Sequence, residues 1–147
     1  MHCILWPRSA CSGVLGALFC LALNVTPAHA DIVVIVNKGG PDSMTKEQVA
    51  DVFLGRTTTL PGGAGAVPQD LPESSALRDE FYSKVTGKSA AQAKSHWSKM
   101  AFTGKGTPPK EGSSTDVKKA VAATPGGIGY VEKAAVDGSV KSVLTIN

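Results

Sequence analysis

Ile32-Val33-Val34-Ile35-Val36 is an unbroken run of five β-branched residues, and the turn-forming cluster Asn37-Lys38-Gly39-Gly40-Pro41-Asp42 follows it. β-branched side chains favour strands, and a strand that lacks polar alternation is buried on both faces. Strands of this kind are typical of the parallel sheets inside α/β proteins. The run therefore predicts a central strand in a layered α/β fold.

Four helices are expected after this strand. Thr45-Lys46-Glu47-Gln48 has the spacing of a capping box, in which the first and last side chains each satisfy a free backbone N–H. Apolar residues then recur at helical spacing on one face. The same argument gives a second capping box at Ser89-Ala90-Ala91-Gln92, a helix with Leu77, Phe81 and Val85 inward before it, and a fourth helix that starts near Asp116 and ends at Pro125.

The remaining strands complete a β-α-β-α-α-α-β-β order. We expect a short strand at 64–67 and two closing strands at 127–131 and 140–146, with loops at 56–66 and 103–114. This order predicts an α/β fold: a single three-layer domain with a mixed sheet flanked by helices. The expected core comprises Val34, Val36, Val52, Phe53, Leu77, Phe81, Trp97, Val121, Ile128 and Val131.

Residues 1–30 have the pattern of a secretory signal peptide. An apolar stretch at 14–23 is too short to span a bilayer, and Ala28-His29-Ala30 supplies small residues for the peptidase. The alternatives are a buried N-terminal helix and lipidation at Cys20, where Phe19 stands in place of a small residue. We therefore expect a signal peptide at 1–30, a domain at 31–147, and a periplasmic or secreted location.

Composition limits the kinds of site that residues 31–147 can form. All three cysteines, Cys3, Cys11 and Cys20, lie in the expected signal, so residues 31–147 can form neither a disulfide nor a thiolate metal site. These residues carry fourteen basic and twelve acidic side chains, and a net charge of +2 is too small to argue for nucleic acid or an acidic membrane. No cofactor is expected.

Three motifs in register resemble the phosphate-type periplasmic substrate-binding proteins of ABC transporters. They are the segment Thr45 to Gly55 after the first strand, Gly104-Lys105-Gly106, and Thr124-Pro125-Gly126-Gly127-Ile128-Gly129-Tyr130-Val131-Glu132. The resemblance spans most of residues 32–133 and implies one lobe of a type 2 periplasmic binding protein. Family members have two lobes that close on a ligand, and the strand at 32–37 matches the segment that enters their second lobe.

The resemblance also implies a ligand site, with one departure from the family. An arginine followed by a Ser/Gly/Thr-rich helix start holds phosphate in the family, whereas Gln69 occupies the arginine position here and only Ser74 and Ser75 keep the hydroxyl pattern. A helix N-terminus can bind an anion, and Lys105 between its glycines can add charge. Alternatively, the serines only cap the helix, or Asp70-Leu71-Pro72-Glu73 forms its own capping box and the helix starts earlier.

The sequence predicts a non-enzymatic solute-binding module for a small oxyanion, linked to phosphate-type uptake or sensing. The candidate ligand residues are Gln69, Ser74, Ser75 and Lys105. No catalytic or metal-binding residue is expected, because His96, the only histidine of residues 31–147, has no metal-binding partner and the serines have no evident base. The alternative is an interaction module that keeps the lobe fold and binds a transporter, a sensor or a second copy of the chain.

The expected cleavage site yields a direct prediction. The exported protein should begin at Asp31, because Ala28 and Ala30 are the small residues that the signal peptidase requires. Intact-mass analysis of the purified exported protein measures this, and a mass that includes residues 1–30 would contradict it.

Overall fold

The computed structural model describes residues 31–147, and the signal peptide expected at 1–30 lies outside the described residues. The described chain contains five strands, four α-helices and one 3₁₀ helix. In order these are β1 (Ile32–Val36), α1 (Lys46–Phe53), β2 (Val67–Asp70), α2 (Ala76–Thr86), α3 (Ala90–Phe102), β3 (Lys110–Glu111), α4 (Ser114–Ala123), β4 (Gly127–Glu132), η1 (Lys133–Ala135) and β5 (Lys141–Ile146).

The strands form one mixed sheet with the order β3-β2-β4-β1-β5. β2 is parallel to both β3 and β4, whereas β1 is antiparallel to both β4 and β5. All five residues of β1 are buried, as predicted, although β1 pairs antiparallel with both neighbours and strands of this kind are more typical of parallel sheets. Helices and loops cover both faces of the sheet at β1. The side chains of β1 are therefore buried on both faces although the strand is antiparallel to its neighbours.

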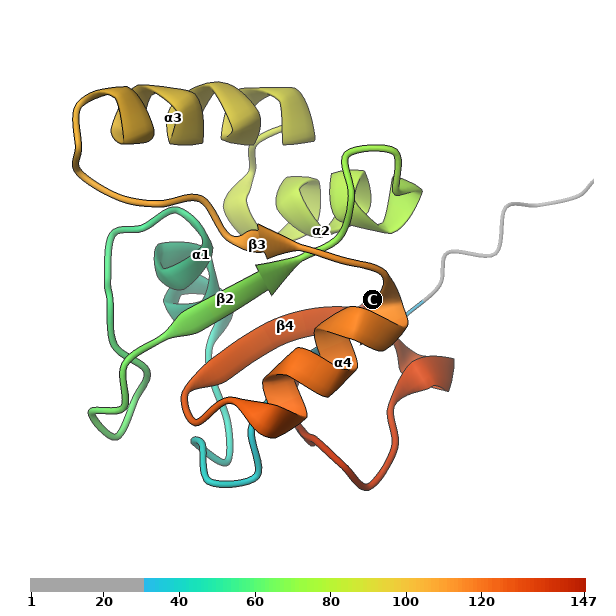
Figure 1. Cartoon of the computed structure of the whole chain (residues 1–147). Coiled ribbons are helices and arrows are strands. Elements are labelled where there is room, and N and C mark those ends of the chain that lie inside the picture. Colours follow the sequence, from blue (N-terminus) through green and yellow to red (C-terminus); the bar gives the residue numbers. More distant parts are fainter. Residues whose placement is uncertain (1–30) are drawn as a thin grey trace, which may run out of the picture.

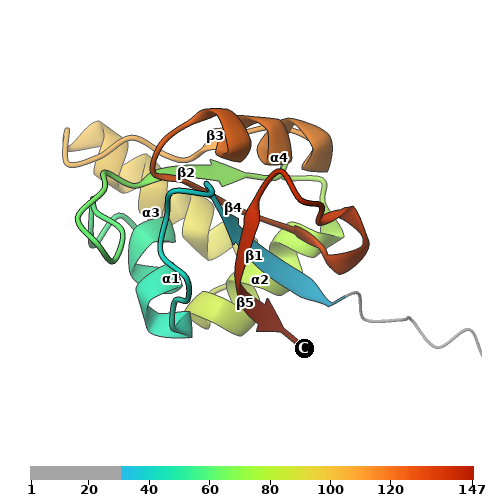
Figure 2. The same ribbon diagram turned by 90° about the horizontal axis from the view of Figure 1, so that it is seen from below.

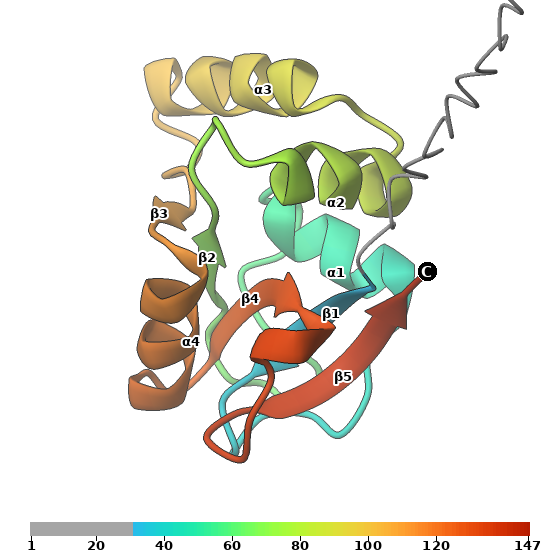
Figure 3. The ribbon, with the colours of Figure 1, turned by 90° about the vertical axis from the view of Figure 1, so that its right-hand side faces the viewer.

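The domain has three layers, which confirms the predicted α/β class. α4 covers one face of the sheet, and α1 and α2 cover the other (Figures 1 and 2). α3 lies outside α2 and forms the outermost part of the molecule on that side (Figure 3). The hydrogen bond from Trp97 Nε1 to the Phe53 carbonyl (2.9 Å) ties α3 to the end of α1.

The structure corrects two of the expected boundaries. β2 occupies Val67–Asp70 rather than 64–67, and the expected loop at 103–114 contains the short strand β3. Gln69 and Asp70 have weak strand propensity, but they pair with Lys110 and Glu111 of β3. Tertiary pairing therefore places these two strands where local sequence does not.

Capping boxes define three helix starts. Thr45 with Gln48, Ser89 with Gln92, and Ser113 with Asp116 each form the reciprocal pair of hydrogen bonds. The alternative capping box at Asp70-Leu71-Pro72-Glu73 is wrong, because α2 begins at Ala76 and Asp70 lies in β2. Ser75 is the N-cap residue of α2, yet its side chain makes no capping hydrogen bond.

Glycines let the sheet and α4 approach closely. A Cβ atom at Gly129 of β4 would lie 2.5 Å from Val117 Cγ1 of α4, and one at Gly126 would lie 1.9 Å from the Gly65 carbonyl oxygen. Gly126 also has a φ of +79°, which other residues rarely adopt. Gly126 before β4 and Gly129 within it are therefore required for close packing. The segment forms a turn into a strand, as its sequence predicts.

All ten predicted core residues are buried. Phe53 of α1 lies at the centre of an aromatic cluster, with its ring centroid 4.9 Å from that of Phe81 and 5.7 Å from that of Tyr130. The rings of Phe81 and Tyr130 stack 3.7 Å apart. This cluster joins both inner helices to β4.

Truncation of Phe53 should therefore be costly. Phe53→Ala removes a fully buried ring from the contact with Phe81 and Tyr130, and it should lower the free energy of unfolding by about 3–5 kcal/mol. Phe102→Ala is the matched control, because that ring is 93% exposed and its loss should change stability by less than about 0.5 kcal/mol. Denaturant unfolding measures both, and a loss below about 1 kcal/mol for Phe53→Ala would show that this helix face is not the core.

Candidate functional site

The carboxyl ends of β2 and β3 form the edge at which the site lies. Open α/β sheets bind ligands outside the carboxyl ends of their strands. β2 ends at Asp70 and leads to α2, while β3 ends at Glu111 and leads to α4. These two acidic residues are paired in the parallel register, so their side chains lie on the same face of the sheet.

The Asp70 carboxylate is buried and almost saturated with donors. Tyr82 Oη donates to it at 2.7 Å, the Leu71 backbone N–H donates at 2.8 Å, and Tyr130 Oη also donates a hydrogen bond. The Arg78 guanidinium lies 3.4 Å away. Burial raises the pKa of Asp70 above its ordinary value, although the hydrogen-bond donors and Arg78 oppose this shift. Burial and the nearby Asp70 carboxylate raise the pKa of Tyr82 and Tyr130.

Arg78 is the second buried member of this cluster. Its Nη1 donates to the Leu71 carbonyl at 3.1 Å and to Glu111 Oε1 at 2.8 Å, so it links α2 to the loop after β2 and to β3. Burial opposes its charge, but the Asp70 carboxylate keeps the pKa of Arg78 above its usual value. Its Nε atom is buried without a hydrogen-bond partner among the described residues.

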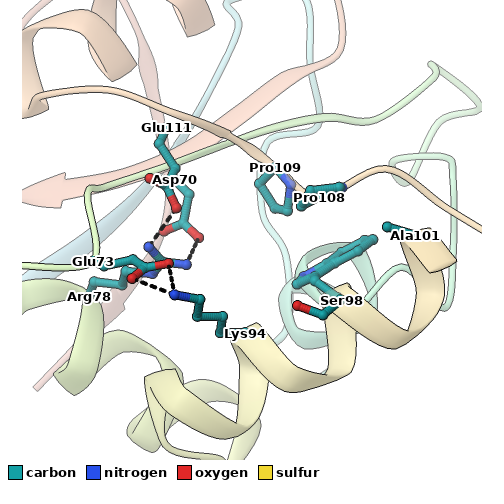
Figure 4. A pocket seen from close by; sticks show the side chains of 10 residues that line it. Asp70, Glu73, Arg78, Lys94, Ser98, Ala101, Pro108, Pro109 and Glu111 are labelled. Carbon is teal, nitrogen blue, oxygen red and sulfur yellow. Dashed lines mark hydrogen bonds and ion pairs between the residues drawn. The ribbon is translucent and has the colours of Figure 1, made fainter.

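A cavity of about 260 Å³ adjoins this cluster, between α3 and the carboxyl ends of β2 and β3 (Figure 4). Charged side chains line one end, where Lys94 of α3 pairs with Glu73 at 2.9 Å. The other end is apolar and contains Trp97, Pro108 and Pro109. Both cations at this cavity, Arg78 and Lys94, are therefore paired with carboxylates of the same chain.

The structure separates the predicted ligand residues. Ser74 and Ser75 lie at the start of α2, and Gln69 points to the opposite face of the sheet, where it lines a cavity of about 570 Å³ against α4. Lys105 lines a third cavity, of about 120 Å³, beyond Trp97. Of the four predicted residues, only Ser74 and Ser75, which are consecutive in the chain, lie at the same place.

The local sequence gives little indication that Arg78 is buried or which residues pair with it. The acidic neighbours Asp79 and Glu80 indicate a mixed surface, yet Arg78 is only 5% exposed. A usable signal exists, because Arg78, Tyr82 and Val85 follow helical spacing and all three are buried. The partners Asp70 and Glu111 come from other elements, and no local pattern indicates them.

The charged groups at this edge are already engaged by other groups of the domain. Donors within the domain contact both oxygens of the Asp70 carboxylate. His96 Nε2 contacts the Leu54 carbonyl at 2.8 Å, which is a packing role. Within residues 31–147, no three His, Cys, Asp or Glu side chains are grouped to hold a metal ion, and no helix is long and apolar enough to cross a membrane.

Several solved structures are similar to this chain. A phosphate ABC transporter substrate-binding protein from Clostridium perfringens, solved with bound phosphate, is 26% identical with a TM-score of 0.61, and the match covers 78% of this chain and 45% of that one. A phosphate transport receptor from Vibrio cholerae is 20% identical (TM-score 0.60, coverage 78% and 46%), and PstS from Borrelia burgdorferi is 14% identical (TM-score 0.58, coverage 78% and 47%).

These matches confirm the predicted resemblance. The chain spans about half the length of the similar structures and has the α/β fold of one lobe of a periplasmic binding protein. No protein-family model and no curated protein matches the chain. The similar proteins are substrate-binding components of transport systems rather than enzymes.

The buried ion pair leads to a stability prediction. Arg78→Met leaves the Asp70 carboxylate without its cation, and it should lower the free energy of unfolding at pH 7 by about 3–5 kcal/mol. The pKa of Asp70 is already raised in the folded protein and should rise further, so the folded variant takes up a proton as the pH falls and the loss should shrink in acid.

A double-mutant cycle measures this coupling by denaturant unfolding. Asp70→Asn removes the charge but keeps an acceptor for the tyrosines, so Arg78→Met combined with Asp70→Asn should cost less than the sum of the single losses. Additive losses that do not change with pH would show that the pair is not coupled.

Proposed function

We propose that the protein is a non-enzymatic solute-binding module that acts outside the cytoplasm and takes a small oxyanion, as the phosphate ABC transporter substrate-binding proteins do. Similarity to phosphate-binding structures supports the ligand class. The observation that carries the proposal is the start of α2, which follows the carboxyl end of β2 and lacks a side-chain cap.

The anion is proposed to bind at Ser74 and Ser75. The Ser75 hydroxyl makes no capping bond, and the structure gives the backbone N–H groups of Ala76 and Leu77 no acceptor among residues 31–147. Free N–H groups and the positive end of the helix dipole favour an anion there. At the start of α4, by contrast, Asp116 accepts hydrogen bonds from the Ser113 backbone N–H and hydroxyl and caps the helix.

The affinity for phosphate should be low. Arginine holds phosphate with two charged hydrogen bonds, but Arg78 is already bonded to Asp70 and Glu111 and buried beside the helix start. Gln69 offers a neutral amide on the other face of the sheet. One lobe also leaves its ligand in water, where the attraction between unit charges at 4 Å is about 1 kcal/mol.

The sequence also indicates an interaction module as an alternative. A large exposed apolar patch would favour it, whereas exposed polar groups with free N–H donors favour solute binding. Val67 and Phe102 are the large apolar side chains that residues 31–147 expose, and they lie on different elements. The surface of the described domain thus supports solute binding better, and a transporter or sensor partner remains part of the proposal.

Calorimetry and thermal shift test the proposal. Phosphate should bind the exported protein more weakly than micromolar, and Ser75→Ala should weaken it further while Ser83→Ala, on an exposed position of the same helix, should not. In a thermal-shift panel of phosphate, sulfate, nitrate and organic acids, a true ligand at 100 times its dissociation constant adds about 2.7 kcal/mol of stability.

One outcome would contradict the expected low affinity, and another would contradict the ligand class. Micromolar or tighter phosphate binding that is lost in Ser75→Ala would show that the site keeps its affinity without an arginine. Failure of every anion in the panel to stabilise the protein would exclude a small oxyanion as the ligand.

A further inference from the structure

The positive charge of the domain is concentrated in one segment. Residues 88–110, which run from just before α3 to the first residue of β3, contain five lysines and no acidic residue. The rest of residues 31–147 carries nine basic and twelve acidic residues. A net charge of only +2 therefore conceals a basic segment attached to an acidic remainder.

Most of this charge is free of ion pairs. Lys94 pairs with Glu73 across the cavity. Lys99, Lys105 and Lys110 are exposed, and none of them makes an ion pair with any residue from 31 to 147. Exposed charges of one sign without internal counter-charges attract a surface of the opposite sign.

Phe102 is exposed in the same basic segment. Its side chain is 93% exposed at the last residue of α3, between Lys99 and Lys105. Residues 92, 95, 99 and 102 share the outward face of the helix, because their spacing is three or four and all are exposed. Figure 3 shows that α3 is the outermost helix on its side, so no other element covers this face.

We propose that Lys99, Phe102 and Lys105, the basic corner, dock the protein on an anionic phospholipid surface. Lysines near such a surface are attracted to the lipid headgroups, and an aromatic ring at the tip can enter the interface between headgroups and acyl chains. A protein partner would need a broader apolar contact than one ring provides. This inference is independent of the proposed oxyanion site, which lies at the start of α2.

Vesicle co-sedimentation tests the lipid contact with the exported protein. Vesicles with 30% phosphatidylglycerol in phosphatidylcholine should retain the protein, and pure phosphatidylcholine vesicles should not. Lys99→Gln with Lys105→Gln should lower the partition coefficient roughly tenfold or more, because each basic residue near the surface contributes about a factor of five. Phe102→Ser should lower it as well, and added salt should weaken binding in the parent protein.

The control is a variant of equal charge. Lys38→Gln with Lys46→Gln removes two exposed lysines far from α3 along the chain and should leave partition within about twofold of the parent. An equal loss in both double variants would overturn the basic corner as a specific surface. Binding to polyglutamate without binding to anionic vesicles would overturn the lipid assignment and indicate an acidic protein partner.

Discussion

The buried carboxylate of Asp70 connects four elements of the domain. It lies at the end of β2, and it accepts hydrogen bonds from Tyr82 of α2 and Tyr130 of β4. Arg78 extends the connection to Glu111 of β3. An ionised carboxylate that is 1% exposed is tolerable only when donors surround it, so the positions of these elements are coupled. Tyr130 also stacks on the ring of Phe81, so apolar packing adds to the polar network.

This network determines the chemistry at the edge of the sheet. A basic side chain one turn into α2 could serve an anion at the helix start, but Asp70 draws Arg78 inward and Glu111 occupies its outer nitrogen. Lys94 is similarly occupied by Glu73. What the edge still offers to an anion are backbone N–H groups and the serine hydroxyls, which are neutral donors. The stability of the lobe and strong anion binding therefore compete for the same cations.

Sequence patterns predicted the features that depend on neighbouring residues. The capping boxes at Thr45 and Ser89, the buried run of β1, and the inward positions of Phe53 and Trp97 all follow from spacing over a few residues. The antiparallel pairing of β1, the place of β2 and the existence of β3 depend on residues far along the chain. Arg78 and Glu111 are 33 positions apart, and no periodicity connects them. The partners of Asp70, Tyr82 and Tyr130, are also distant in sequence, so local spacing alone suggested a helix-capping role for Asp70.

The orientation of α3 follows from the residues that anchor it. Trp97 is buried and donates to the Phe53 carbonyl, and His96 contacts the Leu54 carbonyl beside it. A helix turns about 100° per residue, so a residue five positions after Trp97 is rotated by about 140° from it. Phe102 therefore faces away from the core whenever Trp97 fills it, and no rotation of the helix can bury both rings on the same side. Exposure of Phe102 is a consequence of the sequence register, and it places an aromatic ring among unpaired lysines.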